Sequence, residues 1–269
     1  MIRITAVIEN NTDVSLPVEH GLALWIEADE KKFFFDLGQS SLFLDNALSL
    51  GIDVQEAQFA IISHGHYDHG GGIAAFIDAN DHAQVYVSRG AFCDYFSTKD
   101  NVSKYIGLDK RIEGNSRIVV NDDIVRLSDT LIIFRGCDGR RYFSPANSRI
   151  LKLQDGNMVC DDFRHEQSLI IIDGSNRVLI AGCAHSGILN IKDRAERLLG
   201  ESITHIVSGL HLMGVTDKAF VSSFADALLQ TGCICHTCHC TSREAYDVLK
   251  AQMGDAISYL SCGKTIEIG

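Results

Sequence analysis

The chain has 269 residues and carries 24 Lys and Arg against 35 Asp and Glu, a formal net charge of −11 at pH 7. This acidic balance argues against a protein that grips nucleic acid or an anionic membrane surface. With 46% hydrophobic and 22% charged residues, the composition is that of a packed globular protein. Because no apolar stretch approaches the ~20 residues of a membrane helix and the first residues lack a signal-peptide pattern, we expect a cytoplasmic protein.

The first 65 residues predict strands and one helix. Short apolar runs separated by turn residues predict the strands. Apolar residues at helical spacing, followed by Gly51, predict the helix. The predicted strands are 2–8, 22–26, 32–35 and 59–62, and the predicted helix is 41–50.

From about residue 90 to 165 the pattern loosens into mixed polar segments, with strands predicted only at 117–120 and 130–134. We interpret 90–165 as a variable stretch that faces the substrate. Beyond it we predict strands at 169–172, 178–181, 203–207 and 233–235, and helices at 188–199, 218–229 and 242–253. Such alternation favours sheets flanked by helices. Since no linker-like segment divides the chain, we predict one α/β domain over residues 1–269.

Four of the predicted strands end in loops that carry histidine. Loops at the carboxyl ends of strands in α/β proteins converge on one crevice, so we expect these four loops to form one site. The segments are His64-Gly65-His66-Tyr67-Asp68-His69, Cys183-Ala184-His185, Leu210-His211 and His236-Thr237-Cys238-His239.

The densest loop places three imidazoles and one carboxylate within six residues, and three glycines that allow a tight turn follow it. Imidazole and carboxylate are good ligands for zinc, iron or manganese. A stretch this short cannot easily direct all four groups at one ion, so two adjacent metals are the better fit. His64 and His66 would bind one metal, and Asp68 and His69 the other.

The same loop resembles the signature of the metallo-β-lactamase superfamily, and Phe35-Asp36-Leu37-Gly38 resembles its first motif, whose aspartate braces the metal loop. Within the superfamily, the chain is similar to the group named for dihydropterin-ribofuranosylaminobenzene 5'-phosphate synthase. The matching segments are Glu19 to Leu22, Ser63 to Gly72, Gly182 to Ile188, Ser208 to Leu212 and His239 to Thr241. The resemblance implies an αββα sandwich, with two packed mixed sheets flanked by helices, and a metal-dependent hydrolase.

The resemblance also implies the remaining site residues. His239 matches the last metal ligand, and His211 matches an element that touches substrate or metal, with a structural role equally open. Many members of the superfamily have an aspartate that bridges the two metals at the position of Cys183 in this chain. The resemblance to the synthase group implies that His185 replaces this aspartate as a ligand, and a thiolate of Cys183 is the alternative. The expected ligands are His64, His66 and His185 at one metal and Asp68, His69 and His239 at the other, with Asp68 and His211 catalytic.

Two close cations lower the pKa of a bound water from ~15.7 towards ~7 and polarise the bond being cleaved. We therefore expect a hydrolase that uses a metal-bound hydroxide on a phosphoester or related small anionic substrate. The expected cofactors are two divalent ions, with zinc favoured and iron, manganese or nickel compatible with the same ligands. Cations that could meet the substrate occur in the variable stretch at Arg135, Arg140, Arg141, Arg149 and Lys152.

Three other functions stay open on the sequence. The group name suggests a condensation of a dihydropterin with an aminobenzene ribofuranosyl phosphate that releases pyrophosphate. Iron-dependent oxidoreductases share the fold, although His66 stands where their di-iron electron-transfer branch has glutamate. A metal or thiol sensor without catalysis is the third, and the intact ligand loop argues against it.

The nine cysteines do not indicate a disulfide framework. Residues 235–239 match the C-x-x-C-H pattern of c-type haem attachment, but that attachment requires export, which we do not expect. A structural zinc site is also disfavoured, because a regular strand would direct the first two cysteines of the run away from the last two. The run consists of Cys233, Cys235, Cys238 and Cys240.

Overall fold

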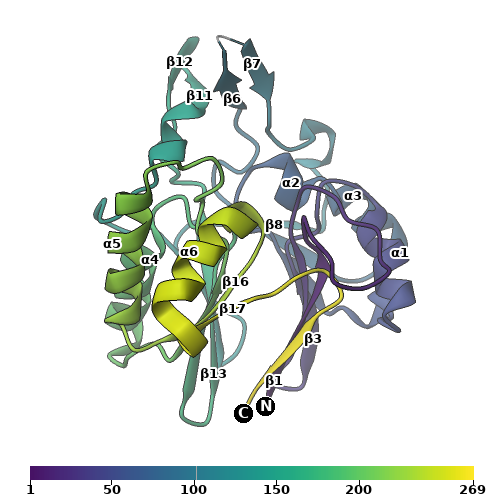
Figure 1. Ribbon diagram of the computed structural model, residues 1–269. Coiled ribbons are helices and arrows are strands. Elements are labelled where there is room, and N and C mark those ends of the chain that lie inside the picture. The colour runs from purple at the N-terminus through teal and green to yellow at the C-terminus, as the bar shows by residue number, and fades with distance from the viewer. Residues whose placement is uncertain (101) are drawn as a thin grey trace.

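Two seven-stranded sheets pack face to face in the computed structural model, which describes residues 1–100 and 102–269 (Figure 1). Helices cover the outer face of each sheet, so the layer order is helix, sheet, sheet, helix. The predicted αββα sandwich is therefore confirmed. None of the helices in the described parts of the chain is long and apolar enough to cross a membrane.

The first sheet combines strands from the N-terminal half with the last strand of the chain. In spatial order its strands are β18 (Thr265–Ile268), β1 (Ile2–Ile8), β2 (Ala23–Ala28), β3 (Lys31–Phe35), β4 (Phe59–Ile61), β5 (Gln84–Ser88) and β8 (Ile118–Asn121). The strands from β18 to β3 pair antiparallel and those from β3 to β8 pair parallel. Its helices are α1 (Leu42–Ser49), α2 (Tyr67–Gly70) and α3 (Ile73–Ala79).

The second sheet is built mainly from the C-terminal half. In spatial order its strands are β17 (Ile257–Tyr259), β16 (Ile234–Thr237), β15 (His205–Ser208), β14 (Asn176–Ile180), β13 (Gln167–Asp173), β10 (Leu131–Arg135) and β9 (Ile124–Arg126). The strands from β14 to β17 pair parallel, and this requires helical crossovers. These helices are α4 (Ile188–Leu199), α5 (Lys218–Leu229) and α6 (Arg243–Met253).

Alternation along the strands explains the three apolar layers. In β3, Phe33 and Phe35 point into the layer between the sheets, whereas Phe34 points into the outer layer under α1 and α3. Both faces of the strand are thus buried, which is why its sequence is an uninterrupted apolar run. Each such aromatic side chain contributes about 1.5–3 kcal/mol through its burial.

A third, four-stranded sheet stands above one edge of the sandwich (Figure 1). Its strands are β12 (Asn157–Cys160), β11 (Ile150–Gln154), β6 (Tyr95–Lys99) and β7 (Val102–Tyr105). Of the strands in residues 90–165, the sequence analysis predicted only β8 and β10 of the large sheets, and it missed β9 at the edge of the second sheet. It missed the small sheet because β7 and β12 are mostly exposed on both faces and so show no apolar alternation.

The strands that precede the histidine loops end at the edge below this small sheet. Three of them, β14, β15 and β16, are neighbours in parallel, so their carboxyl ends lie together. The fourth, β4, belongs to the opposite sheet. The packing of the two sheets therefore brings all four loops to one place.

Candidate metal centre

Asp36, directly after β3, braces the loop that follows β4. Its carboxylate accepts a hydrogen bond from the Ser63 amide at 2.7 Å and lies 2.6 Å from Nδ1 of His69. Both residues are fully buried, so these bonds are shielded from water. Because Nδ1 of His69 is occupied, only Nε2 is available to a metal. This is the bracing role that the family resemblance implied for Asp36.

The first cluster of expected ligands consists of His64, His66 and His185. Their ring centroids lie 4.5 to 5.0 Å apart. Nε2 of each ring is buried and has no hydrogen-bond partner within the described chain. A buried ring nitrogen without a partner is unfavourable, so three such atoms side by side fit a bound cation.

Neutral side chains orient two of these rings. Nδ1 of His64 lies 2.8 Å from the Ser63 hydroxyl, and Nδ1 of His185 lies 3.0 Å from the amide oxygen of Asn147. Metal-binding histidines typically use their second nitrogen in this way, which fixes the ring and the tautomer. The arrangement leaves Nε2 of each ring as the metal-binding atom.

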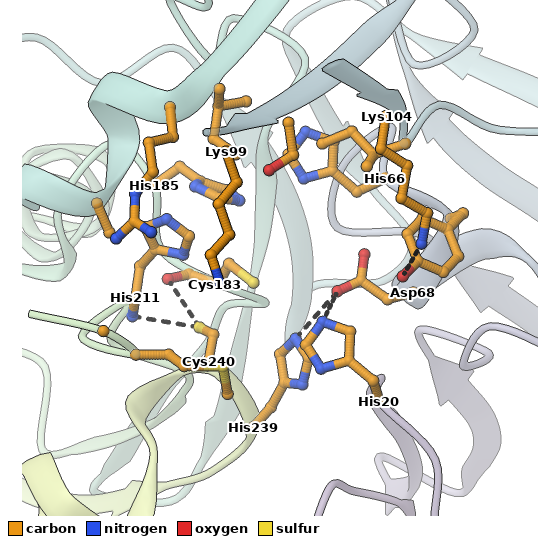
Figure 2. Close-up of a pocket in the computed structure, with 18 of the residues that line it drawn as sticks. His20, His66, Asp68, Lys99, Lys104, Cys183, His185, His211, His239 and Cys240 are labelled. Atoms are coloured by element: carbon orange, nitrogen blue, oxygen red, sulfur yellow. Dashed lines mark hydrogen bonds and ion pairs between the residues drawn. The ribbon is translucent and has the colours of Figure 1, made fainter. Parts of the chain in front are cut away.

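The second cluster consists of Asp68, His69 and His239. Nε2 of His69 and Nε2 of His239 are 3.2 Å apart, and Oδ2 of Asp68 lies 3.4 Å from the latter. Nδ1 of His239 contacts the side chain of Asn10 at 2.8 Å. His20 also approaches Asp68, with 3.1 Å between Nε2 and Oδ2 (Figure 2). The structure thus brings together the second set of expected ligands and adds His20 beside it.

Cys183 lies between the two clusters. Its Sγ is 3.2 Å from Nε2 of His69. It also belongs to three possible ligand groups, one with His64 and His185, one with His69 and His239 and one with His211 and Cys240; within each group the donor atoms lie within 4.8 Å of one another. The structure therefore places both His185 and Cys183 at the centre, rather than one in place of the other.

His211 lies beside the first cluster, with its ring centroid 4.1 Å from that of His185. Both of its ring nitrogens are buried and have no partner among the described residues. Its backbone is left-handed, with φ at 48°, and its amide donates a hydrogen bond to Sγ of Cys240 at 3.2 Å. Such a conformation is unfavourable for a non-glycine residue and is held by its surroundings.

The electrostatics of the two clusters differ. Burial, followed by the neighbouring imidazoles, holds the pKa of His64 and His185 well below the ordinary value, and burial lowers the pKa of His66 to about 3. These three rings are neutral at physiological pH, the form that binds metal. Burial disfavours the charged forms of His69 and Asp68 as well, but in both cases nearby charges outweigh it. The carboxylates of Asp36 and Asp68 raise the pKa of His69. The charge of His69 and the contacts with His20 and His239 hold the pKa of Asp68 well below its usual range.

Two buried glutamates that the sequence analysis missed hold the ligand loops. Glu166 accepts hydrogen bonds from the amides of His185 and Ser186 at 2.7 and 2.9 Å. Glu9 accepts one from the amide of His239 at 2.6 Å. Glu166 directly precedes β13 and Glu9 directly follows β1, and an acidic residue next to an apolar strand was the available signal.

His165 anchors the first loop in the same manner. Its Nδ1 accepts a hydrogen bond from the Gly65 amide at 2.9 Å, so its Nε2 carries the proton and donates to Asp161 at 2.9 Å. Both side chains are buried. The sequence analysis treated this part of the chain as variable and did not identify the pair.

A cavity of about 390 Å³ opens above the two clusters (Figure 2). Its walls include Ile106, Ala146 and Ile150 from the segments around the small sheet. Of the five cations predicted to be available to the substrate, Arg149 lines the cavity. The other four are engaged elsewhere: Arg141 with Asp193, Lys152 with Asp162, Arg135 with backbone carbonyls and Arg140 over the ring of Phe143.

The cysteine run does not form one site. Cys233 and Cys235 pack into the core beneath α4 to α6, Cys238 lies in the layer between the sheets and Cys240 lines the cavity. Cys233 and Cys235 therefore point away from Cys238 and Cys240, as the alternation of side chains along a strand predicts. The two cysteines of the C-x-x-C-H pattern therefore face different layers.

Comparisons with known proteins agree with this geometry. A family model described as the metallo-beta-lactamase superfamily matches residues 16–128. An uncharacterized protein of Methanocaldococcus jannaschii is 29% identical, covering 100% of both chains. The 7,8-dihydropterin-6-methyl-4-(beta-D-ribofuranosyl)-aminobenzene-5'-phosphate synthase of the same organism is 24% identical over 93% of this chain and 90% of its own. The crystal structure of a metal-dependent hydrolase of the beta-lactamase superfamily is 26% identical, covers 100% of this chain and 99% of its own, and superposes with a TM-score of 0.85.

Proposed function

Because this chain belongs to the metallo-beta-lactamase superfamily, we propose that it is a metal-dependent hydrolase of a phosphoester or a related small anionic substrate. The observation that carries the proposal is the set of three buried, unpartnered Nε2 atoms of the first cluster, beside the second cluster at the floor of one cavity. The similarity over the full chain to a structure described as a metal-dependent hydrolase supports it.

The residues fit two divalent cations, for which zinc is the first choice. His64, His66 and His185 would hold one, Asp68, His69 and His239 the other, and Cys183 lies within reach of both groups. When bound, two such ions lower the pKa of a coordinated water and polarise the bond that is cleaved.

Asp68 and His211 would act on the protons. Asp68 is the single carboxylate of the cavity wall, so it supplies the negative charge of the second cluster and can orient the proton of the attacking water. His211 presents two ring nitrogens that have no partner within the described residues, and a ring nitrogen held there can donate a proton to the leaving group.

A second candidate is favoured by the relative that is named as a synthase. That protein matches 93% of this chain, and its name describes the formation of an aminobenzene phosphate compound of a dihydropterin. The corresponding reaction here is a condensation that releases pyrophosphate. The same two clusters would serve it, because divalent cations stabilise a departing pyrophosphate.

The test is elemental analysis of protein purified without added metal, together with a screen of phosphomonoesters and phosphodiesters on the same sample. Zinc or manganese with turnover supports the hydrolase, provided that a chelator abolishes turnover and metal restores it. Pyrophosphate release from a dihydropterin diphosphate, with no phosphoester turnover, supports the synthase. Iron with oxygen uptake, or protein without bound metal, contradicts both proposals.

A further inference from the structure

Three cations line the upper wall of the cavity. Lys99 is the last residue of β6, Lys104 lies in β7, and Arg149 ends the short 3-10 helix Pro145–Arg149. Figure 2 shows the side chains of Lys99 and Lys104 reaching from the small sheet towards the ligand residues below. All three therefore meet a molecule that enters the cavity on the side opposite the metal clusters.

None of these three side chains forms an ion pair with any other residue that the structure describes. The contrast with other cations of residues 90–165 is direct, because Lys110 pairs with Asp94 at 2.6 Å and Lys152 pairs with Asp162 at 2.7 Å. The chain has 35 acidic against 24 basic residues. Three cations without an acidic partner among the described residues thus gather at one wall of the cavity.

The cavity itself does not neutralise them. Asp68 is the single carboxylate among the residues that line it, and its Oδ2 already contacts His20 and His239 at 3.1 and 3.4 Å. The remaining lining side chains are neutral or basic. An anionic group of the bound molecule is thus the available partner for the three cations.

Two of the cations are positioned by the segments that carry the chemistry. Nζ of Lys104 lies 4.9 Å from the ring centroid of Tyr67 and 3.4 Å from its hydroxyl, and Tyr67 directly follows His66. The guanidinium of Arg149 packs against Gly214, where a Cβ would lie only 3.3 Å from Nη2. These contacts place both charges at the cavity wall, although the two side chains are exposed.

We propose that Lys99, Lys104 and Arg149 form a subsite for a phosphate group of the substrate that does not react. A guanidinium offers a planar pair of donors that matches phosphate oxygens, and two ammonium groups complete the neutralisation of a dianion. The inference rests on the proposed function, because the metal clusters take the reacting group. The substrate is then a small organic molecule with a phosphate at one end and the scissile ester at the other.

The test measures the binding of inorganic phosphate by calorimetry at low ionic strength. The triple variant Lys99→Ala, Lys104→Ala, Arg149→Ala is compared with wild type, each first with its metals and again after a chelator has removed them. The matched control is Lys110→Ala, Arg141→Ala, Lys152→Ala, which removes three cations that are already paired. Circular dichroism verifies that each protein is folded.

We expect chelated wild type and the control to bind phosphate with a dissociation constant that weakens as salt is added. The cavity variant should bind about tenfold more weakly or worse, because three charge-assisted contacts to the phosphate are lost. The triple variant Lys99→Arg, Lys104→Arg, Arg149→Lys should retain binding. Equal affinity of wild type and the cavity variant would overturn the proposal.

The two proposals can fail separately. Loss of phosphate binding in the cavity variant without any phosphoester turnover by wild type would leave the subsite standing and remove the hydrolase. Phosphoester turnover by wild type, with unchanged phosphate binding in the cavity variant, would support the hydrolase and overturn the subsite. Once a substrate is known, the cavity variant should raise KM far more than it lowers kcat.

Discussion

The ligand edge of the sandwich and the small sheet above it are built in opposite ways. At the edge, the expected ligands are buried, and each loop that carries them is held by a buried acceptor such as Asp36, Glu166 or Glu9. In the small sheet, all four residues of β7 are exposed, and Val102 and Met158 are 69% and 42% exposed. The ligand edge is fixed by several buried contacts, whereas the small sheet above it has few and can change more freely.

Sequence distance explains the difference. The bond between His239 and Glu9 joins residues 230 positions apart, so the edge exists only when both sheets are assembled. The small sheet consists of the hairpins β6–β7 and β11–β12, which pair locally. A change in one hairpin can therefore alter the cavity wall without disturbing the ligands.

The largest effect is expected for His64→Ala, which removes a ligand from the first cluster. Substitutions outside the ligand set already reduce metal affinity or activity by roughly 10- to 100-fold, so we expect activity to fall by more than about 100-fold. Metal per chain, measured by elemental analysis, should fall by about one ion. The control is His82→Ala on the surface, and equal metal content in both variants would contradict a metal at this cluster.

Asp68→Asn should act mainly on turnover. The amide keeps the shape of the side chain but removes the only carboxylate charge of the cavity wall, so we expect kcat to fall by about 100-fold with most of the metal retained. Steady-state kinetics on any accepted phosphoester measures this. Asp122→Asn, at an exposed ion pair, is the matched control. Full turnover by the Asp68 variant would show that the mechanism is wrong.

Cys183→Ser tests whether the thiol between the clusters binds metal. Since Sγ lies within reach of both ligand groups, we expect cobalt-substituted wild type to show a sulfur-to-cobalt charge-transfer band that this variant loses. Metal affinity should fall by roughly 10- to 100-fold. Cys240→Ser, which changes the neighbouring buried thiol, should keep the band. Absence of the band in wild type would leave His185 as the replacement for the bridging aspartate, whereas a band that survives in Cys183→Ser would show that another thiol binds the metal.

Glu166→Gln tests the anchoring of the loop rather than the ligands themselves. One amide oxygen cannot replace the two carboxylate oxygens that hold the amides of His185 and Ser186, so we expect metal affinity to fall roughly tenfold. Competition with a chelating dye gives the dissociation constant. The control is Glu56→Gln, which changes an exposed glutamate. Equal metal dissociation constants for the two variants would show that the hydrogen bonds of Glu166 do not contribute to metal binding.

The smallest effect is expected for Met158→Ser in the small sheet. The side chain is 42% exposed and lies outside the cavity wall, so the free energy of unfolding should change by no more than about 0.5 kcal/mol. Metal content and turnover should remain at the wild-type values. A loss of metal in this variant would show that the small sheet and the ligand edge are coupled.

Much of the sandwich could be predicted because its elements carry local signals. The helices α4 and α5 have the bounds that apolar periodicity predicted, and α4 ends at Gly200 in a left-handed conformation. The small sheet could not be predicted, because strands exposed on both faces have no such periodicity. Likewise Lys99 and Lys104 carried no signal, since an unpaired lysine is recognised only once its neighbours are known.

The sequence by itself determined which side chains gather at this edge: the spacing of His64, His66, Asp68 and His69 and the histidines at later strand ends already predicted a cluster of potential metal ligands. Only the tertiary structure decided how the centre is held and covered. Glu9, Asn10 and His165 reach their loops across the two sheets, and Cys183 meets both clusters because those sheets pack face to face. Ligand identity is a local property of side chains, whereas the partners that orient ligands are set by contacts between residues far apart in the chain.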